Sequence, residues 1–102
     1  MIRHVVMWRL RAQSADERYN ACEMVKRAFE SLRGRVPGMM RLEVGIDESR
    51  VDYACDVVLV CDFESAAALG AYAANPEHLR VRDELGGIRT HRYQVDYVVC
   101  DH

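Results

Sequence analysis

Apolar and polar residues alternate in four stretches of the chain, and each alternation predicts a β-strand. The four stretches are residues 2–10, 40–46, 53–63 and 93–99. In the first of them, one side carries Ile2, His4, Val6, Trp8 and Leu10. The third stretch is apolar on both sides in its middle, which is typical of a strand covered on both faces. We therefore expect residues 53–63 to form a central strand.

Between the first two strands, the spacing of apolar residues changes to that of a helix. Ser14 and Glu17 have the Ser-x-x-Glu form of a capping box, in which each side chain satisfies a free backbone N–H at a helix start. Apolar residues then recur every three or four positions as far as Val36, and Pro37 and Gly38 follow. The pattern predicts a helix that begins after Ser14 and runs to Val36.

The segment between the last two strands predicts a helix in two pieces. Ser65 is a candidate N-cap for a short alanine-rich helix. Asn75 and Pro76 interrupt this helix, because the residue before a proline avoids helical backbone angles. The same two residues suit the N-cap and first position of a further helix, which we expect to end near Leu85.

This order, βαββαβ with a divided second helix, predicts an α+β ferredoxin-like fold. Right-handed crossovers bring the strands into a four-stranded antiparallel sheet with the helices on one face. The face that carries His4 and Trp8 is the more apolar one and is expected to lie under the helices. The chain has 102 residues, which is the size of one domain, so residues 1–102 are treated as a single domain.

The other face of the predicted sheet is also apolar at its centre. An uncovered apolar patch of this kind usually marks an interface, and two such sheets can pair around a twofold axis. We therefore predict a homodimer, with the two protomers forming a dimeric α+β barrel. The residues expected at the interface are Val5, Met7, Val58, Val60 and Val98.

Composition excludes several functional classes. The chain has 14 Lys+Arg against 16 Asp+Glu and a pI near 6.1, and it lacks the clustered positive charge that nucleic-acid binding requires. Its apolar runs are all shorter than the roughly 20 residues of a membrane helix, so a cytoplasmic protein with no membrane partner is expected. The four cysteines have no CxxC spacing, which predicts reduced thiols and no metal site. No cofactor-binding motif is present, so no cofactor is expected.

The strongest candidate for chemistry is a histidine at the start of the last predicted helix. If Asn75 is the N-cap, His78 occupies the third helical position, where the helix dipole favours the neutral imidazole that a general base needs. Tyr72, at the end of the preceding helix, could donate its hydroxyl to a carbonyl oxygen. His4 faces the same helices from the first strand. The apolar wall of such a pocket would comprise Val6, Trp8, Val25 and Phe29.

Each of these residues also has a purely structural interpretation. Tyr72 suits a core aromatic with a satisfied hydroxyl, and His4 suits a hydrogen-bonded core histidine. Trp8, Val25 and Phe29 have the spacing of ordinary core residues. The pattern alone leaves both interpretations open.

Five motifs in order resemble the stress-responsive A/B barrel (Dabb) family over nearly the whole chain. They are Ile2 to Leu10, Val36-Pro37-Gly38-Met39 with Leu42 to Gly45, Phe63-Glu64-Ser65 with Leu69 and Tyr72, Asn75 to His78, and Val95-Asp96-Tyr97. The resemblance implies a ferredoxin-like protomer and a dimeric barrel, in agreement with the apolar-patch argument.

The resemblance also implies a role for two of the candidate residues. A plant polyketide cyclase with this fold uses a histidine and a tyrosine at the positions of His78 and Tyr72, and its pocket includes a first-strand histidine that matches His4. That cyclase has a further pocket histidine where this chain has Val57, so its substrate does not transfer. Two functions follow: a cofactor-independent cyclase or lyase acting on a carbonyl-rich substrate, or a non-catalytic module that binds a small apolar or aromatic ligand or serves in a stress response.

Overall fold

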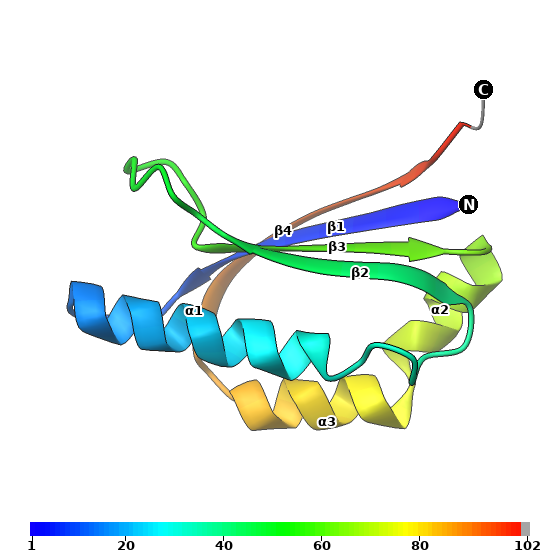
Figure 1. The fold of residues 1–102 in the computed structure, drawn as a ribbon, viewed down its shortest axis with the longest axis horizontal. Helices are drawn as coiled ribbons and strands as arrows, with labels where there is room; N and C mark the ends of the chain where they lie inside the picture. Colours follow the sequence, from blue (N-terminus) through cyan, green and yellow to red (C-terminus); the bar gives the residue numbers. More distant parts are fainter. Residues whose placement is uncertain (101–102) are drawn as a thin grey trace.

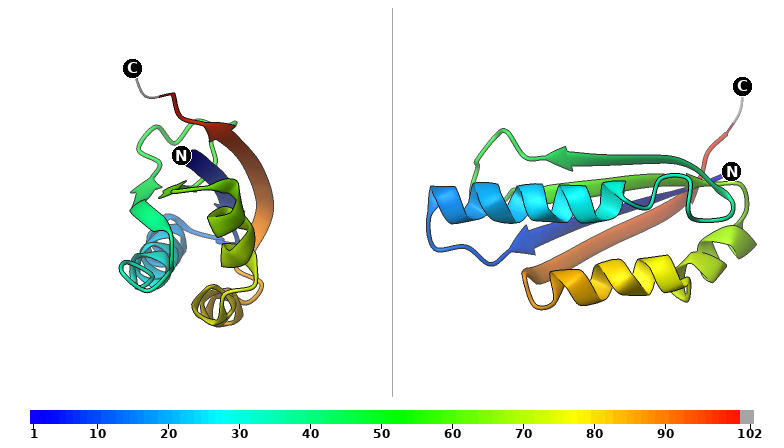
Figure 2. Two further views of the ribbon diagram at one scale, coloured as in Figure 1. Left: turned by 90° about the vertical axis from the view of Figure 1, so that its right-hand side faces the viewer. Right: turned by 60° about the horizontal axis from the view of Figure 1, so that its bottom comes forward.

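A computed structural model describes residues 1–100 and contains four strands and three helices within them (Figure 1). The elements are β1 (Ile2–Leu10), α1 (Ala15–Glu30), β2 (Met39–Ile46), β3 (Val57–Phe63), α2 (Ala66–Ala73), α3 (Pro76–Leu85) and β4 (Arg89–Val98). The strands form one sheet in the order β2-β3-β1-β4, and every neighbouring pair is antiparallel. All three helices lie on one face of this sheet, with α1 and α3 side by side (Figure 2). The α+β ferredoxin-like fold is thus confirmed.

The three predicted helix starts are confirmed, each by a side-chain cap. Ser14 accepts a hydrogen bond from the backbone N–H of Glu17 at 3.1 Å, and Ser65 accepts one from Ala68 at 3.1 Å. Asn75 accepts one from Glu77 at 2.8 Å and is followed by Pro76 at the first helical position. These bonds satisfy backbone donors that the first turn leaves free, so a short polar residue fixes where each helix begins.

Two elements are shorter than predicted. α1 ends at Glu30 and not at Val36, and turns connect it to Pro37. Leu32 and Val36 stay buried in these turns, so their apolar spacing continues although the helix does not. β3 begins at Val57, four residues later than its pattern indicates, because residues 53–56 belong to the preceding loop.

The core lies between the sheet and the helices, as predicted. Trp8 of β1 stacks on Phe29 of α1, with ring centroids 5.0 Å apart and planes inclined by 16°. Val6 and Val25 lie beside them and are fully buried. His4 is buried on the same face of the sheet. The face that carries His4 and Trp8 is therefore the one the helices cover.

The register of β4 corrects one predicted position. Residues that face each other across antiparallel strands project to the same side of a sheet. Val98 is paired with Ile2, which shares the side of His4, so Val98 lies on the helix side and not on the opposite face. The predicted register of residues 93–99 is thus wrong by one residue, and such a shift moves every side chain of a strand to the other side.

The face without helices, called the open face below, is apolar at its centre. Cross-strand pairing places four of the five predicted interface residues there, namely Val5, Met7, Val58 and Val60. β4 adds Tyr93, Val95 and Tyr97, which are 52%, 53% and 44% exposed. Asp62 is buried beside this patch, where Arg3 donates two hydrogen bonds to it at 2.8 and 3.1 Å. Hydrogen bonding to Arg3 lowers the pKa of the Asp62 carboxyl and keeps it ionised.

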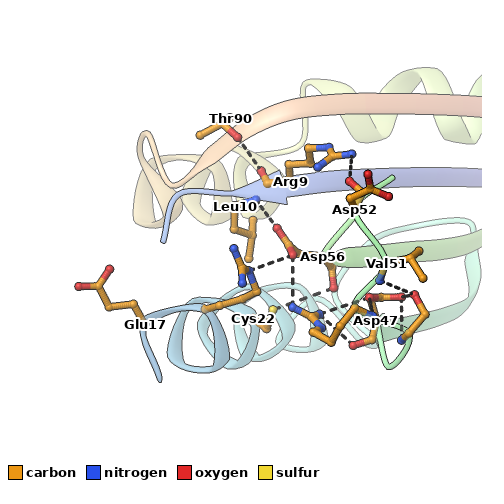
Figure 3. Close-up of polar contacts among 12 residues, drawn as sticks. Arg9, Leu10, Glu17, Cys22, Asp47, Val51, Asp52, Asp56 and Thr90 are labelled. Carbon is orange, nitrogen blue, oxygen red and sulfur yellow. Dashed lines mark hydrogen bonds and ion pairs between the residues drawn. The ribbon is translucent and has the colours of Figure 1, made fainter. Parts of the chain in front are cut away.

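The loop between β2 and β3 is held by one carboxylate (Figure 3). Asp56 accepts a hydrogen bond from the backbone N–H of Leu10 at 2.8 Å. Its other oxygen lies 3.3 Å from Arg18 of α1 and 3.6 Å from Arg50 of the loop. This one side chain therefore connects the end of β1, the first turns of α1 and the loop, at the end of the sheet away from α2.

The four cysteines, all within the described residues, are free thiols. Cys22 and Cys61 are buried, as expected for small apolar side chains, whereas Cys100 is exposed. Burial raises the pKa of the Cys61 thiol to about 12. Of the helices in residues 1–100, none is long and apolar enough to span a bilayer.

Candidate functional site

The break between α2 and α3 brings Tyr72 and His78 together. Tyr72 lies in the last turn of α2, and the backbone carbonyl of Tyr72 accepts a hydrogen bond from the N–H of Asn75 at 3.1 Å. Asn75 then caps α3, so that His78 lies in its first turn. The ring centroids of Tyr72 and His78 are 4.4 Å apart, and the ring of His4 lies 6.1 Å from that of Tyr72. The three predicted side chains therefore form one cluster.

The hydroxyl of Tyr72 is the most unusual atom of this cluster. The residue is 4% exposed, and its hydroxyl oxygen has no hydrogen-bond partner within residues 1–100. Burial raises the pKa of this phenol, so it remains protonated and able to donate. A buried polar group without a partner destabilises a fold by about 1–3 kcal/mol, which makes it a candidate contact for a ligand.

The ring of His78 is half-buried and oriented by the backbone. Its Nδ1 lies 3.3 Å from the carbonyl oxygen of Ala73. Because a carbonyl can only accept, this contact requires the proton on Nδ1 and leaves Nε2 with a free lone pair. Burial, together with the charges of Arg89, Arg82 and Arg92, lowers the pKa of His78 below its ordinary value of 6.5. The neutral imidazole that the sequence predicts from the helix dipole is thus favoured chiefly by desolvation.

His4 is tied to the edge strand. Its Nδ1 lies 2.6 Å from a carboxylate oxygen of Asp96 on β4. A carboxylate accepts only, so Nδ1 carries a proton and Nε2 is the remaining ring nitrogen. Gln94 in turn donates to the other oxygen of Asp96 at 3.1 Å. His4 is thus a hydrogen-bonded buried histidine, as in its structural interpretation, and its ring is also nearly perpendicular to that of Tyr72, at an interplanar angle of 73°.

The predicted apolar wall behaves mostly as core. Val6, Val25 and Phe29 are fully buried, and their predicted contact with a ligand stays a prediction that this packing does not support. Trp8 is different, because it also borders a hollow of about 210 Å³. The residues that line this hollow are Trp8, Gly86, Arg89, Thr90, His91 and Arg92.

Sequence reasoning missed the contribution of β4 to the site. Arg92, Gln94 and Asp96 are paired with Trp8, Val6 and His4, so they lie on the helix side of the sheet. Arg89 is the first residue of β4, and its guanidinium carbon lies 5.2 Å from the centroid of the Trp8 ring. The alternation of residues 92, 94 and 96 contained the signal, but it is readable only once the register of β4 is known. The site is therefore polar on its β4 side.

A larger hollow of about 650 Å³ lies on the open face, next to the loop between β2 and β3. Met7, Val58, Tyr53 and Tyr93 are among the residues that line it. Its lining contains no histidine within the described residues, and its carboxylates Asp47 and Asp56 are held in ion pairs. We therefore place the candidate chemistry at the Tyr72 cluster.

A protein-family model matches nearly the whole chain. The sequence model of the stress responsive A/B barrel domain, Dabb, matches residues 2–99. Among curated proteins, no relative matches the chain.

Solved structures with the same fold are numerous. A dimeric protein of unknown function and ferredoxin-like fold from Bacteroides fragilis is 25% identical, with a TM-score of 0.82 over 94% of this chain and 93% of that one. A dimeric ferredoxin-like protein of unknown function from Thermobifida fusca is 20% identical, with a TM-score of 0.80 over 96% and 90%. A hydroxynitrile lyase from Passiflora edulis is 18% identical, with a TM-score of 0.76 over 99% and 94%.

Proposed function

The chain belongs to the stress responsive A/B barrel domain family, and from this premise we propose that it is a cofactor-independent enzyme of lyase or cyclase type. Its substrate is a small carbonyl compound, and its chemistry takes place at Tyr72 and His78. One observation carries the proposal: a buried phenol, whose hydroxyl has no partner in residues 1–100, has its ring 4.4 Å from an imidazole whose pKa is lowered.

The roles of the two side chains follow from their protonation states. His78 accepts a proton at Nε2 from a carbon next to a carbonyl group, or from a hydroxyl group, and becomes an imidazolium. When the proton comes from carbon, the electron pair of the broken C–H bond moves toward the carbonyl oxygen and forms an enolate, whose carbon can bond to a second carbonyl carbon. When the proton comes from a hydroxyl group, the electron pair of the broken O–H bond forms the new C=O bond, and the bond from that carbon to the leaving group, such as cyanide, breaks with its electron pair on the leaving group. In both cases negative charge develops on the substrate oxygen. Tyr72 donates a hydrogen bond to that oxygen as its negative charge develops. The proton on His78 then returns to the product, so neither an oxidant nor a reductant is consumed.

Access to the phenol requires a local movement. The Tyr72 hydroxyl is closed off from water, and the ring of His78, 4.4 Å from that of Tyr72, is only half-buried. We infer that a small shift of the His78 side chain admits the ligand. Such a shift leaves the core around Val25 and Phe29 unchanged.

The proposal is tested with a panel of candidate substrates. β-Dicarbonyl compounds and short polyketide thioesters probe cyclase chemistry, and aromatic cyanohydrins probe the lyase chemistry for which the Passiflora edulis protein is named. We expect turnover of at least one class by the wild-type protein. If the protein binds members of the panel but converts none of them, the non-catalytic ligand-binding module is the better description.

The substitution Tyr72→Phe separates function from stability. Removal of a buried hydroxyl that lacks a partner should leave the free energy of unfolding unchanged or raise it by about 1 kcal/mol. Turnover should fall about a hundredfold, because the developing oxyanion loses its donor. Urea unfolding and steady-state kinetics measure the two effects. A loss of stability in this variant would mean that the hydroxyl is satisfied in solution, which contradicts the proposal.

We further propose that two copies of the chain pair through their open faces. This proposal is supported by the exposed apolar patch of the open face. Tyr93, Val95 and Tyr97 of β4 extend the patch that the apolar residues of β1 and β3 form. Its centre has the aromatic and aliphatic composition of a homodimer interface. The Bacteroides fragilis and Thermobifida fusca proteins are described as dimeric.

Val95→Asp tests this pairing. Val95 lies opposite Val5 at the centre of the open face, so an aspartate there would bring an unpaired carboxylate into the interface. We expect a monomer by sedimentation velocity at concentrations where the wild-type protein is dimeric. Met24→Asp on α1 is the matched control, because Met24 is also a partly exposed apolar residue, but lies away from the sheet. Equal sedimentation of wild type and Val95→Asp would exclude this interface.

A further inference from the structure

Arg89 differs from the other arginines of the chain. It is half-buried, and its guanidinium carbon lies 5.2 Å from the ring centroid of Trp8 and 5.8 Å from that of Phe29. The guanidinium forms neither an ion pair nor a hydrogen bond with any of residues 1–100. By contrast, Arg11, Arg27 and Arg82, which also lack ion pairs within that range, are exposed to water.

A cation in this position is unfavourable without an anion. Stacking on an aromatic ring offsets part of the desolvation, but it uses only one face of the guanidinium and none of its N–H donors. Burial, followed by the charge of Arg92, lowers the pKa of Arg89. The five N–H groups of the planar guanidinium therefore remain available for a ligand.

The positive charge of Arg89 is close enough to the site described above to affect its side chains. The positive charges of Arg92 and Arg89 act on the Tyr72 hydroxyl, and both also act on His78. Arg89, Arg92 and Trp8 all line the hollow of about 210 Å³. Gly86 of the hollow lies eight residues beyond His78 at the other end of α3, about 12 Å along the helix axis, so a carboxylate in the hollow and a carbonyl group at Tyr72 and His78 would belong to opposite ends of one elongated ligand.

We propose that the ligand of this site is a carbonyl compound that carries a carboxylate, and that Arg89 binds this carboxylate with Arg92 as the second cation. A guanidinium matches the planar carboxylate with two parallel N–H···O bonds. A single negative charge suits the site better than a phosphate dianion. Asp96 lies on the same side of β4 as Arg92 and Gln94, and its carboxylate would repel a dianion more strongly than a monoanion. The inference rests on the proposed function for the carbonyl group, whereas the carboxylate contact is measurable without turnover.

The test compares benzoate with benzamide, its uncharged isostere, by titration calorimetry at constant ionic strength. We expect benzoate to bind the wild-type protein at least about tenfold more tightly than benzamide, the ratio that one charge-assisted contact provides. Arg89→Gln should remove this preference, and Arg27→Gln, at an exposed position on α1, should keep it. Equal affinity for the two probes, or an unchanged preference in Arg89→Gln, would overturn the proposal. Tighter binding of inorganic phosphate than of benzoate would overturn the assignment to a carboxylate.

A second variant guards against simple loss of folding. Arg89→Met keeps an unbranched apolar stem over Trp8 but carries no charge, so it should fold with a near-wild-type melting temperature and bind both probes equally. The outcome is also separable from that of the proposed function. If benzoate binding depends on Arg89 but Tyr72→Phe keeps full turnover, the anion site is supported and the catalytic assignment of Tyr72 is refuted. If Arg89→Gln keeps the preference for benzoate but Tyr72→Phe loses turnover, only the anion site is refuted.

Discussion

Replacement of His78 by glutamine is expected to lower turnover by about 10²–10⁴-fold, the range that a positioned general base contributes. Glutamine keeps the length and polarity of the side chain, and it is acceptable in the first turn of α3. It cannot accept a proton near neutral pH, however. The loss should therefore appear in kcat, which steady-state kinetics measure directly.

The pH dependence of the same reaction gives a second measurement of His78. Because burial lowers the pKa of this histidine, the neutral base is populated at lower pH than for a free imidazole. Turnover should rise with pH through a pKa below 6.5 and remain level above it. This acidic limb should be absent in His78→Gln.

The matched control for His78→Gln is Glu17→Gln. Glu17 occupies the equivalent third position of α1, where Ser14 caps the helix, and it lies outside the proposed site. Wild-type turnover in Glu17→Gln shows that glutamine in a first helical turn is tolerated. Wild-type turnover in His78→Gln would remove the enzyme assignment from this residue.

Gly38→Ala is expected to destabilise the fold by about 3 kcal/mol. Gly38 has a φ of +80°, which costs an alanine about 1–2 kcal/mol. A Cβ atom at this position would also lie 2.6 Å from the Cβ of Ala68 on α2, and neither atom can rotate away. The overpacking adds a further ~1–3 kcal/mol. Equilibrium unfolding in urea measures the total.

Gly34→Ala is the control that isolates the steric part. Gly34 has a similar φ of +74°, but a Cβ there would meet no atom within 4 Å among the described residues. It should therefore show the backbone cost alone. If the two variants lose equal stability, α2 moves aside freely to admit the new methyl group. Because α2 carries Tyr72, a forced shift of this helix should also lower turnover in Gly38→Ala but not in Gly34→Ala.

Local signals in the sequence were sufficient for most of the fold. The alternation of residues 2–10 predicted β1 with its exact bounds, and Ser14, Ser65 and Asn75 marked all three helix starts. These signals are read within a few residues and depend on backbone chemistry alone. Helix ends were less accurate, because Leu32 and Val36 keep the apolar spacing of α1 after the helix has changed into turns.

The site was only half predictable because its β4 side depends on long-range pairing. Tyr72, His78 and His4 were identified from a helix break and one strand. Placing Asp96 and Arg92 required the register between β4 and β1, which sequence alternation does not determine when both sides of a strand face a surface. The apolar side of β4 was expected under the helices, whereas it joins the open face, and its polar side joins the site.

This division of β4 has a consequence for the proposed assembly. Odd-numbered residues from Tyr93 to Tyr97 would contact the second copy, and even-numbered residues from Arg92 to Asp96 would border the ligand. Strand β4 then takes part in both binding events, so a loss of backbone flexibility caused by one event also affects the other. If formation of the dimer increases the affinity for the ligand by some factor, binding of the ligand must increase the affinity of the two copies for each other by the same factor.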